Sequence, residues 1–237
     1  MSDDDLIPAA TVLVLRDSSE GLEVLMLRRN SEIAFGGIWV FPGGKVDPGD
    51  EAGSVLNSAR QAAARELAEE TSLSVSADEL IDWSYWVPPM VPAIAQRGPR
   101  RRFSTWFFAV AAPPAFRDEV SVDGGEIHEH QWLTPRRAFE LRAAGEIDLV
   151  PPTFVTLHQL NAHQSVEAAL LWASATESEE FRTRGIKAKP LSVAWAGDAC
   201  YENGPDGPML AESDQPIAPI HRLVFHKDRD WEYLRSS

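Results

Sequence analysis

Three glutamates, Glu66, Glu69 and Glu70, are spaced at i, i+3 and i+4 along the sequence. Residues three and four apart are neighbours on a helix surface, so this spacing predicts three carboxylates on one helix face. Carboxylates this close repel one another unless a cation lies among them, and Mg²⁺ prefers oxygen ligands of this kind. A cation held there with an open position could polarise a phosphate or activate a water molecule. The spacing therefore indicates a metal-dependent hydrolytic site.

A glycine-rich turn lies upstream of the glutamates and gives them a recognisable context. Gly43 and Gly44 follow a short aromatic and β-branched run at 37–41, which predicts a strand that ends at the turn. The residues from 54 to 71 predict a helix, because Ser54 is a good N-cap and alanines fill its interior. A strand, a loop and then an acidic helix form the context that such a site requires.

The turn and the helix together resemble the Nudix box, whose usual form is G-x5-E-x7-R-E-U-x-E-E-x-G-U, with U an aliphatic residue. Gly44 is the opening glycine, and Asp50 stands where the family has glutamate. The second half of the box is matched in order by Arg65, Glu66, Leu67, Glu69, Glu70 and Leu73.

The match departs from the usual box in three places. Asp50 is shorter than glutamate, and Ser72 replaces the glycine near the end of the helix. Fourteen residues separate Asp50 from Arg65, where the usual box has seven. The extra seven residues amount to about two helical turns, so they can lengthen the loop or the helix without rotating the glutamate face.

The segments around the box resemble coenzyme A diphosphatase-type Nudix proteins, in particular the sub-branch with an insertion inside the box. This resemblance covers roughly residues 9 to 160. It implies hydrolysis of a nucleoside diphosphate linked to another group X, with coenzyme A or acyl-coenzyme A as the favoured substrate. ADP-ribose, NADH and nucleotide sugars are alternatives. The matching segments are 27–30, 35–44, 102–108, 132–133 and 149–153.

The same resemblance implies roles for the residues of the box. The three glutamates would hold Mg²⁺ or Mn²⁺ ions, and Arg65 would orient them by ion pairing. The backbone at Gly43 and Gly44 would bend close to the metal. Asp47 and Asp50 are each either structural partners or ligands beyond the first shell of the metal.

The family often takes a further carboxylate from a segment far downstream of the box. Glu126 and Glu129 precede Trp132 in a predicted strand, where they fall on opposite faces, so at most one can point toward the metal. We expect Glu126 to be that ligand. Glu129 remains an alternative, and so does His128, which shares the face of Glu126 and could act as a base near neutral pH.

Several arginines are candidates for recognising the phosphates of the substrate. Arg28 and Arg29 follow a predicted strand beside the box loop, and Arg102 ends a run of four arginines between 97 and 102. Guanidinium groups match phosphate oxygens well. We therefore expect Arg28, Arg29 and Arg102 to bind substrate, although the run could equally be a solvated basic loop.

The order of predicted elements indicates an α/β protein, and the resemblance implies the Nudix-type α/β/α sandwich with a mixed sheet over residues 1–149. Near 150 two prolines break the chain, so we expect a C-terminal α+β extension over 150–237 that packs on the first domain and supports a homodimer. The predicted strands are 9–15, 22–28, 38–41, 103–111 and 127–133, the helices are 54–71, 135–144, 153–163 and 166–175, and a hairpin lies within 221–234.

Composition narrows the class of protein. The net charge of −14 disfavours a general nucleic-acid binder, whose affinity comes from Lys and Arg. No apolar run reaches the roughly 18 residues of a membrane-spanning helix, and the acidic N-terminus is unlike a signal peptide. The single cysteine, Cys200, fits a reducing compartment. We therefore expect a cytoplasmic protein that binds a small nucleoside diphosphate derivative, with neither nucleic-acid nor membrane partners.

One alternative belongs to another functional class. A nucleotide-binding regulator could keep the Nudix scaffold without catalysis. Such proteins usually lose a box glutamate, and all three glutamates are present in this sequence. The sequence therefore favours an enzyme.

Overall fold

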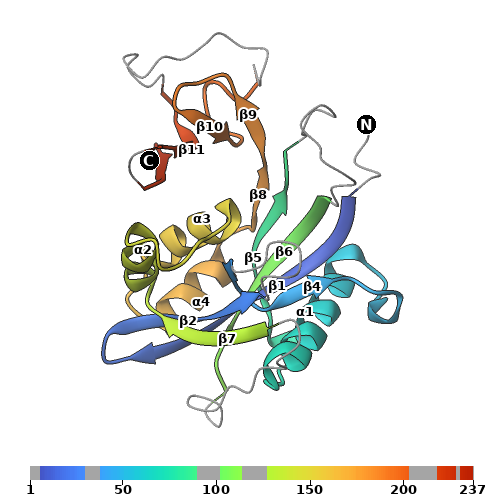
Figure 1. Ribbon diagram of the computed structural model, residues 1–237. Coiled ribbons are helices and arrows are strands. Elements are labelled where there is room, and N and C mark those ends of the chain that lie inside the picture. Colours follow the sequence, from blue (N-terminus) through green and yellow to red (C-terminus); the bar gives the residue numbers. More distant parts are fainter. Residues whose placement is uncertain are drawn as a thin grey trace. The chain divides into compact units, whose positions relative to one another are not determined.

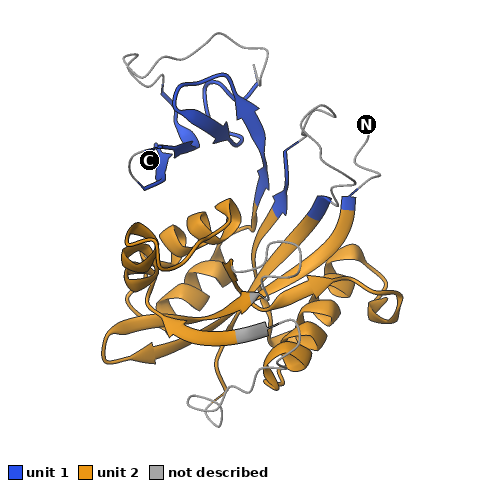
Figure 2. Ribbon diagram, in the orientation of Figure 1, with its two compact units in different colours: residues 1–6, 86–103, 180–237 blue, residues 7–85, 104–179 orange. Residues whose placement is uncertain are grey.

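The computed structural model forms two compact units, which we call the large unit and the small unit (Figure 2). The large unit comprises residues 7–85 and 104–179, and the small unit comprises residues 1–6, 86–103 and 180–237. The structure describes residues 6–29, 38–89, 102–113, 127–202, 218–227 and 230–236.

A mixed sheet forms the centre of the large unit (Figure 1). Its strands run in the order β3-β2-β1-β6-β5, while β4 also pairs with β1 and β7 also pairs with β2. The predicted α/β fold is therefore confirmed. The strands are β1 Leu6–Ser18, β2 Gly21–Arg29, β3 Trp39–Val40, β4 Gly43–Lys45, β5 Ile81–Val87, β6 Arg102–Ala111 and β7 Ile127–Leu133.

Strands β1 and β2 form the predicted hairpin. The buried apolar strand β1 is followed by a turn that a serine hydroxyl and a glycine stabilise. Residues 12–15 of β1 are completely buried, which explains why they alternate so little in polarity. Ser18 lies opposite Gly21, and its hydroxyl accepts the Glu20 N–H at 3.1 Å. Gly21 has φ of +115°, a conformation that favours glycine.

Helix α1, Val55–Thr71, is the predicted box helix. The Ser54 hydroxyl caps it by accepting the Asn57 N–H at 3.1 Å. The helix ends at Ser72, which has φ of +62°, so the left-handed position where the box usually has glycine is retained with serine. The alanine-rich face packs against β1, β2 and β6 in a cluster that includes Ala59, Ala62, Ala63, Leu67, Leu25, Leu27, Phe108 and Val110.

Three further helices belong to the large unit. They are α2 Pro135–Ala143, α3 Pro151–Leu160 and α4 Val166–Ala175, and they correspond to the helices predicted over 135–144, 153–163 and 166–175. Phe139 of α2 packs against Phe154 of α3 with ring centroids 5.2 Å apart. Figure 1 shows α1 on one side of the sheet and α2 and α3 on the other, as in an α/β/α sandwich.

The small unit contains a four-stranded antiparallel sheet in the order β12-β11-β10-β9. The predicted terminal hairpin corresponds to β11 and β12, with Leu223 opposite Tyr233. Trp195 and Phe181 are completely buried in this unit. The strands of this sheet are β9 Arg184–Ile186, β10 Leu191–Ala194, β11 His221–Phe225 and β12 Glu232–Arg235, whereas β8 Glu179–Arg182 pairs with β5.

The two units differ in charge. The large unit contains 10 Lys and Arg against 24 Asp and Glu, and the small unit contains 12 of each, so the whole net charge of −14 belongs to the large unit. Helices α3 and α4 are grouped with the large unit, although we placed them in an extension from residue 150. The predicted boundary at residue 150 and the predicted packing of residues 150–237 on the first domain stay predictions.

No helix in the described parts of the chain is both long enough and apolar enough to cross a membrane.

Candidate functional site

Arg65 lies at the centre of the box and holds Asp50 in a two-pronged ion pair. Its Nε donates to Oδ1 at 3.0 Å and its Nη2 donates to Oδ2 at 2.9 Å. The Asp50 carboxylate also accepts the Asp47 N–H at 2.8 Å. These bonds, the one from Arg65 above all, lower the pKa of Asp50. Asp50 therefore stays ionised and fixes the loop between β4 and α1.

Arg65 also contacts two of the three glutamates. Its Nη1 donates to Glu66 at 3.0 Å and to Glu69 at 3.2 Å. Its Nη2 donates to the backbone carbonyl of Lys45 at 3.0 Å, which ties α1 to the end of β4. The structure thus gathers Asp50, Glu66 and Glu69 around one guanidinium, an arrangement suited to the orienting role that we predicted for Arg65.

Gly44 makes room for Glu66. A methyl group at Gly44 would overlap the Glu66 carboxylate in its present position and would displace the end of that side chain. Burial raises the pKa of Glu66, and the charges of Glu69 and Asp47 add to this effect, while Arg65 opposes it. Desolvation is the main cause of this shift, so the ionised form of Glu66 is less favourable here than in water.

Glu70 is buried and is turned toward the glycine turn. Its carboxylate accepts the Gly43 N–H at 2.8 Å. A side chain at Gly43 would overlap the backbone of Ala10 and Thr11 in β1, so this position also requires glycine. The bond between Glu70 and Gly43 cannot be predicted from local sequence, because it depends on how β4 is placed over α1.

These residues match the chemistry of a hard divalent cation. Four carboxylates, those of Asp47, Asp50, Glu66 and Glu69, lie within 3.9 Å of Arg65, and all their donor atoms are oxygens. No three Asp, Glu, His or Cys side chains of the described residues converge closely enough to hold a metal. A bound ion would therefore require glutamates to turn away from Arg65 or, for Glu70, from Gly43.

The predicted downstream ligands are only partly visible. Glu126 and the side chain of His128 lie outside the described residues. Glu129 accepts hydrogen bonds from Arg28 at 3.4 Å and from Gln131 at 3.0 Å. Its carboxylate is thus engaged with two side chains of the sheet.

The register of β7 on β2 shows which way its residues point. Glu129 lies opposite Arg28, and His130 lies opposite Leu27. Opposing residues of an antiparallel pair share a face of the sheet. Because Leu27 and Trp132 pack in the cluster that contains α1, His130 faces α1, whereas Glu129 faces the other side.

The predicted substrate arginines are spread over the two units. Arg28 is half exposed and pairs with Glu129. Arg102 belongs to the small unit, where its Nη2 donates to the Pro88 carbonyl at 3.0 Å. The side chain of Arg29 lies outside the described residues. Their predicted roles stay predictions.

Known proteins resemble this chain in sequence and in fold. A family model described as NUDIX domain matches residues 5–152. A relative from Caenorhabditis elegans that bears the name nudix hydrolase 7 is 25% identical over 253 residues, which span 86% of this chain and 81% of the relative. The crystal structure of a NUDIX hydrolase from Alicyclobacillus acidocaldarius has a TM-score of 0.58 and 24% identity, over 73% of this chain and 97% of that chain. The structural match supports the fold.

Proposed function

The chain belongs to the NUDIX family and is a Nudix pyrophosphohydrolase, and on that premise we propose how its residues act and on what. The proposed reaction is hydrolysis of the diphosphate bond in a nucleoside diphosphate linked to a group X. Water attacks one phosphorus, the bond from that phosphorus to the bridging oxygen breaks, and two phosphate monoesters leave. Such chemistry asks the protein for positioning and charge neutralisation.

Nudix hydrolases generally use divalent metal ions. We propose Mg²⁺ or Mn²⁺, held by Glu66, Glu69 and Glu70, with Glu126 as the downstream ligand. When bound, the ion would neutralise phosphate charge and lower the pKa of a water molecule.

The protein's own residues prepare this site. Arg65 orients Glu66 and Glu69, and Asp50 anchors Arg65 to the loop. Gly43 and Gly44 let the turn approach Glu66 and the buried Glu70. The observation that carries the proposal is the crowding of four carboxylates around one guanidinium.

For the substrate we propose coenzyme A or acyl-coenzyme A, with Arg28, Arg29 and Arg102 as phosphate ligands. The support comes from the sequence segments around the box and from the lengthened box itself. Residues 51–54 form a loop and 55–64 add turns to α1 before Arg65. The proposed insertion would therefore fall partly in the loop and partly in the helix. ADP-ribose, NADH and nucleotide sugars are the second choice.

A substrate panel tests this proposal. The protein is incubated with Mg²⁺ and coenzyme A, acetyl-coenzyme A, NADH, ADP-ribose or a nucleotide sugar, and products are identified by mass. We expect adenosine 3′,5′-bisphosphate and 4′-phosphopantetheine from coenzyme A, at a rate above that with the other compounds. Faster turnover of ADP-ribose, NADH or the nucleotide sugar would make that compound the favoured substrate instead of coenzyme A. Nucleotide binding without any turnover would favour a non-catalytic, nucleotide-binding regulator.

We further propose a cytoplasmic homodimer. The buried free thiol of Cys200 is compatible with a reducing compartment. The aromatic and proline-rich sequence of residues 150–237 supports a role in association. Light scattering coupled to gel filtration would decide between one and two chains.

A further inference from the structure

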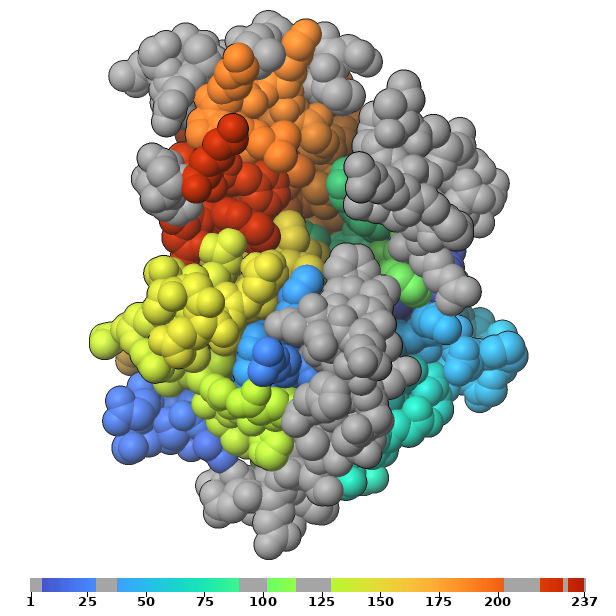
Figure 3. Space-filling model, viewed as in Figure 1, coloured from blue at the N-terminus to red at the C-terminus, as the bar shows by residue number. Residues whose placement is uncertain are grey.

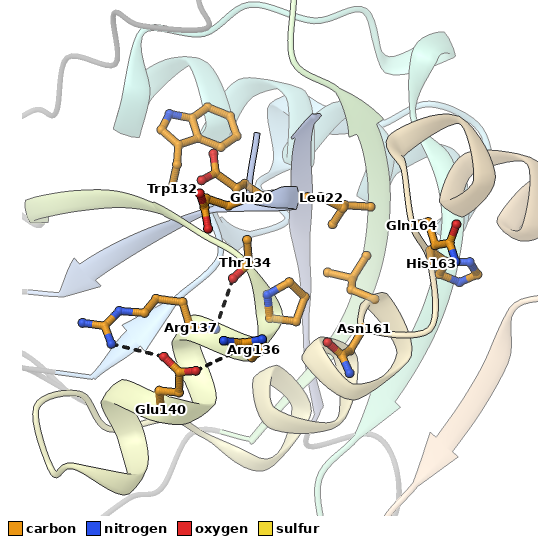
Figure 4. A pocket seen from close by; sticks show the side chains of 14 residues that line it. Glu20, Leu22, Trp132, Thr134, Arg136, Arg137, Glu140, Asn161, His163 and Gln164 are labelled. Carbon is orange, nitrogen blue, oxygen red and sulfur yellow. Dashed lines mark hydrogen bonds and ion pairs between the residues drawn. The ribbon is translucent and has the colours of Figure 1, made fainter. Parts of the chain in front are cut away.

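A second cavity lies in the large unit, apart from the box (Figure 4). Its volume is about 550 Å³, within the range of small-molecule sites. Three segments form its walls: the tip of the β1–β2 hairpin, the start of α2, and the connection between α3 and α4. The hairpin tip and α2 also lie next to each other in the space-filling view (Figure 3). The residues lining the cavity are all different from the box residues.

One wall of the cavity carries surplus positive charge. Arg136 Nε donates to one oxygen of Glu140 at 3.0 Å, and Arg137 Nη1 donates to the other at 3.3 Å (Figure 4). Two guanidinium groups thus share a single carboxylate. Each guanidinium has five N–H donors, and the described contacts use one on each. This wall can therefore bind a further anion, although it belongs to a unit with a large excess of acids.

The other walls offer neutral hydrogen-bonding groups and two carboxylates, those of Glu20 and Glu23, of which Glu23 is already paired with Arg16 at 2.7 Å. Asn161 and Gln164 project from the α3–α4 connection, and their side chains have no partner among the described residues. The His163 ring packs against Trp172 at 5.3 Å, and burial lowers the pKa of His163, so the ring is neutral near pH 7. Glu20 lies at the hairpin tip, where it can accept hydrogen bonds from ligand hydroxyls.

We propose that this cavity binds a phosphate monoester that also carries hydroxyl or amide groups. Paired guanidinium groups suit phosphate oxygens, and charge-assisted bonds to phosphate are stronger than neutral ones. The neutral groups and Glu20 complement the polar remainder of such a molecule. The inference rests on the proposed function for its choice of ligand, because both products of that reaction are phosphate monoesters. The site is thus a product-binding site separate from the box.

Calorimetric titration of the full chain in EDTA tests this inference without measuring turnover. The probes are AMP, adenosine and inorganic phosphate. We expect AMP to bind, inorganic phosphate to bind more weakly, and adenosine not to bind. The double variant R136Q/R137Q should weaken AMP binding by about tenfold or more, since it removes two charge-assisted contacts. The matched control is K187Q/K189Q, which removes two positive charges from exposed lysines of the small unit and should bind AMP normally.

Two further variants separate this site from the box and from effects on folding. E66Q/E69Q should keep its affinity for AMP, because neither residue lines the cavity. Asn161→Asp adds a negative charge at the opposite wall without changing α2, and it should also weaken binding. Unchanged affinity in both R136Q/R137Q and Asn161→Asp would overturn the inference, as would loss of binding in E66Q/E69Q or no AMP binding at all. AMP binding at the cavity in a protein that hydrolyses none of the panel would instead reject only the proposed function.

Discussion

Asp198 and Arg222 in the small unit make the same two-pronged contact as Asp50 and Arg65 in the large unit, but their surroundings differ. Arg222 Nε donates to Asp198 at 2.7 Å and Nη2 donates at 2.9 Å. The Asp198 carboxylate also accepts the N–H groups of Cys200 and His221. Both side chains are buried, and one negative charge meets one positive charge. The charges of this pair are therefore balanced, and its carboxylate accepts four hydrogen bonds.

Arg65 instead is shared by several acids. It bonds Asp50, Glu66 and Glu69, and Asp47 lies 3.9 Å away. One positive charge therefore faces four negative ones, and burial of Glu66 makes the imbalance costlier. The comparison teaches that the two-pronged pair alone does not mark a functional site. A balanced pair stabilises the fold, whereas an unbalanced one leaves negative charge for a cation to neutralise.

The largest expected effect is on the balanced pair. Asp198→Asn leaves the buried Arg222 without a counter-charge, which should lower the free energy of unfolding by about 3–5 kcal/mol. Urea denaturation followed by tryptophan fluorescence measures this. The control is Glu202→Gln, which removes an exposed partner of Arg184 and should cost well under about 1 kcal/mol. A similar loss of unfolding free energy in the two variants would show that the buried Asp198–Arg222 pair stabilises the fold no more than an exposed pair does.

The unbalanced site should respond in activity rather than in stability. Glu69→Gln keeps the shape of the side chain but removes a charge, and we expect a drop in kcat of about two orders of magnitude. Unfolding should change little, because Glu69 is exposed. Glu51→Gln, which changes an exposed acid in the loop before α1, should keep its activity. Steady-state rates on the best substrate measure both, and normal activity in Glu69→Gln would remove this residue from the site.

The pH dependence of folding stability separates the anchoring role of Asp50 from a metal-binding role. Its pKa is lowered in the folded protein, so the carboxylate stabilises the fold above the unfolded value near 3.8, and this is lost as the pH falls through the lowered pKa. Asp50→Asn should therefore cost about 1–2 kcal/mol at pH 7 and progressively less toward acid. Thermal unfolding of metal-free wild type and Asp50→Asn between pH 7 and pH 3 tests this. A difference in unfolding free energy between the two proteins that stays constant over this range would contradict the anchoring role.

Local sequence signals were sufficient for most of the scaffold. Ser54 caps the predicted helix and the apolar run of β1 predicts a buried strand, because both features depend on neighbours in the chain. The resemblance to the Nudix box implied that Arg65 orients the glutamates, and Arg65 donates to Glu66 and Glu69.

The remaining features depend on contacts between distant segments. Glu70 turns to Gly43 only because β4 pairs with β1 over the helix. The direction of Glu129 follows from its register on β2, where a bulge lies between Arg28 and Arg29. Strand alternation separated the faces of Glu126 and Glu129, but it could not say which face meets α1. The second cavity joins three loops, none of which carries a motif.

Calorimetric and thermal titration of metal-free protein with Mg²⁺ tests the central claim most directly. An unbalanced carboxylate cluster should bind the ion, and wild-type protein should gain about 2.7 kcal/mol of stability at a hundredfold excess of Mg²⁺ over its Kd. Without metal, E66Q/E69Q should be at least as stable as wild type, because it relieves the charge imbalance, and it should gain no stability from Mg²⁺. Equal stabilisation of wild type and E66Q/E69Q by Mg²⁺, or no stabilisation of wild type, would contradict the account.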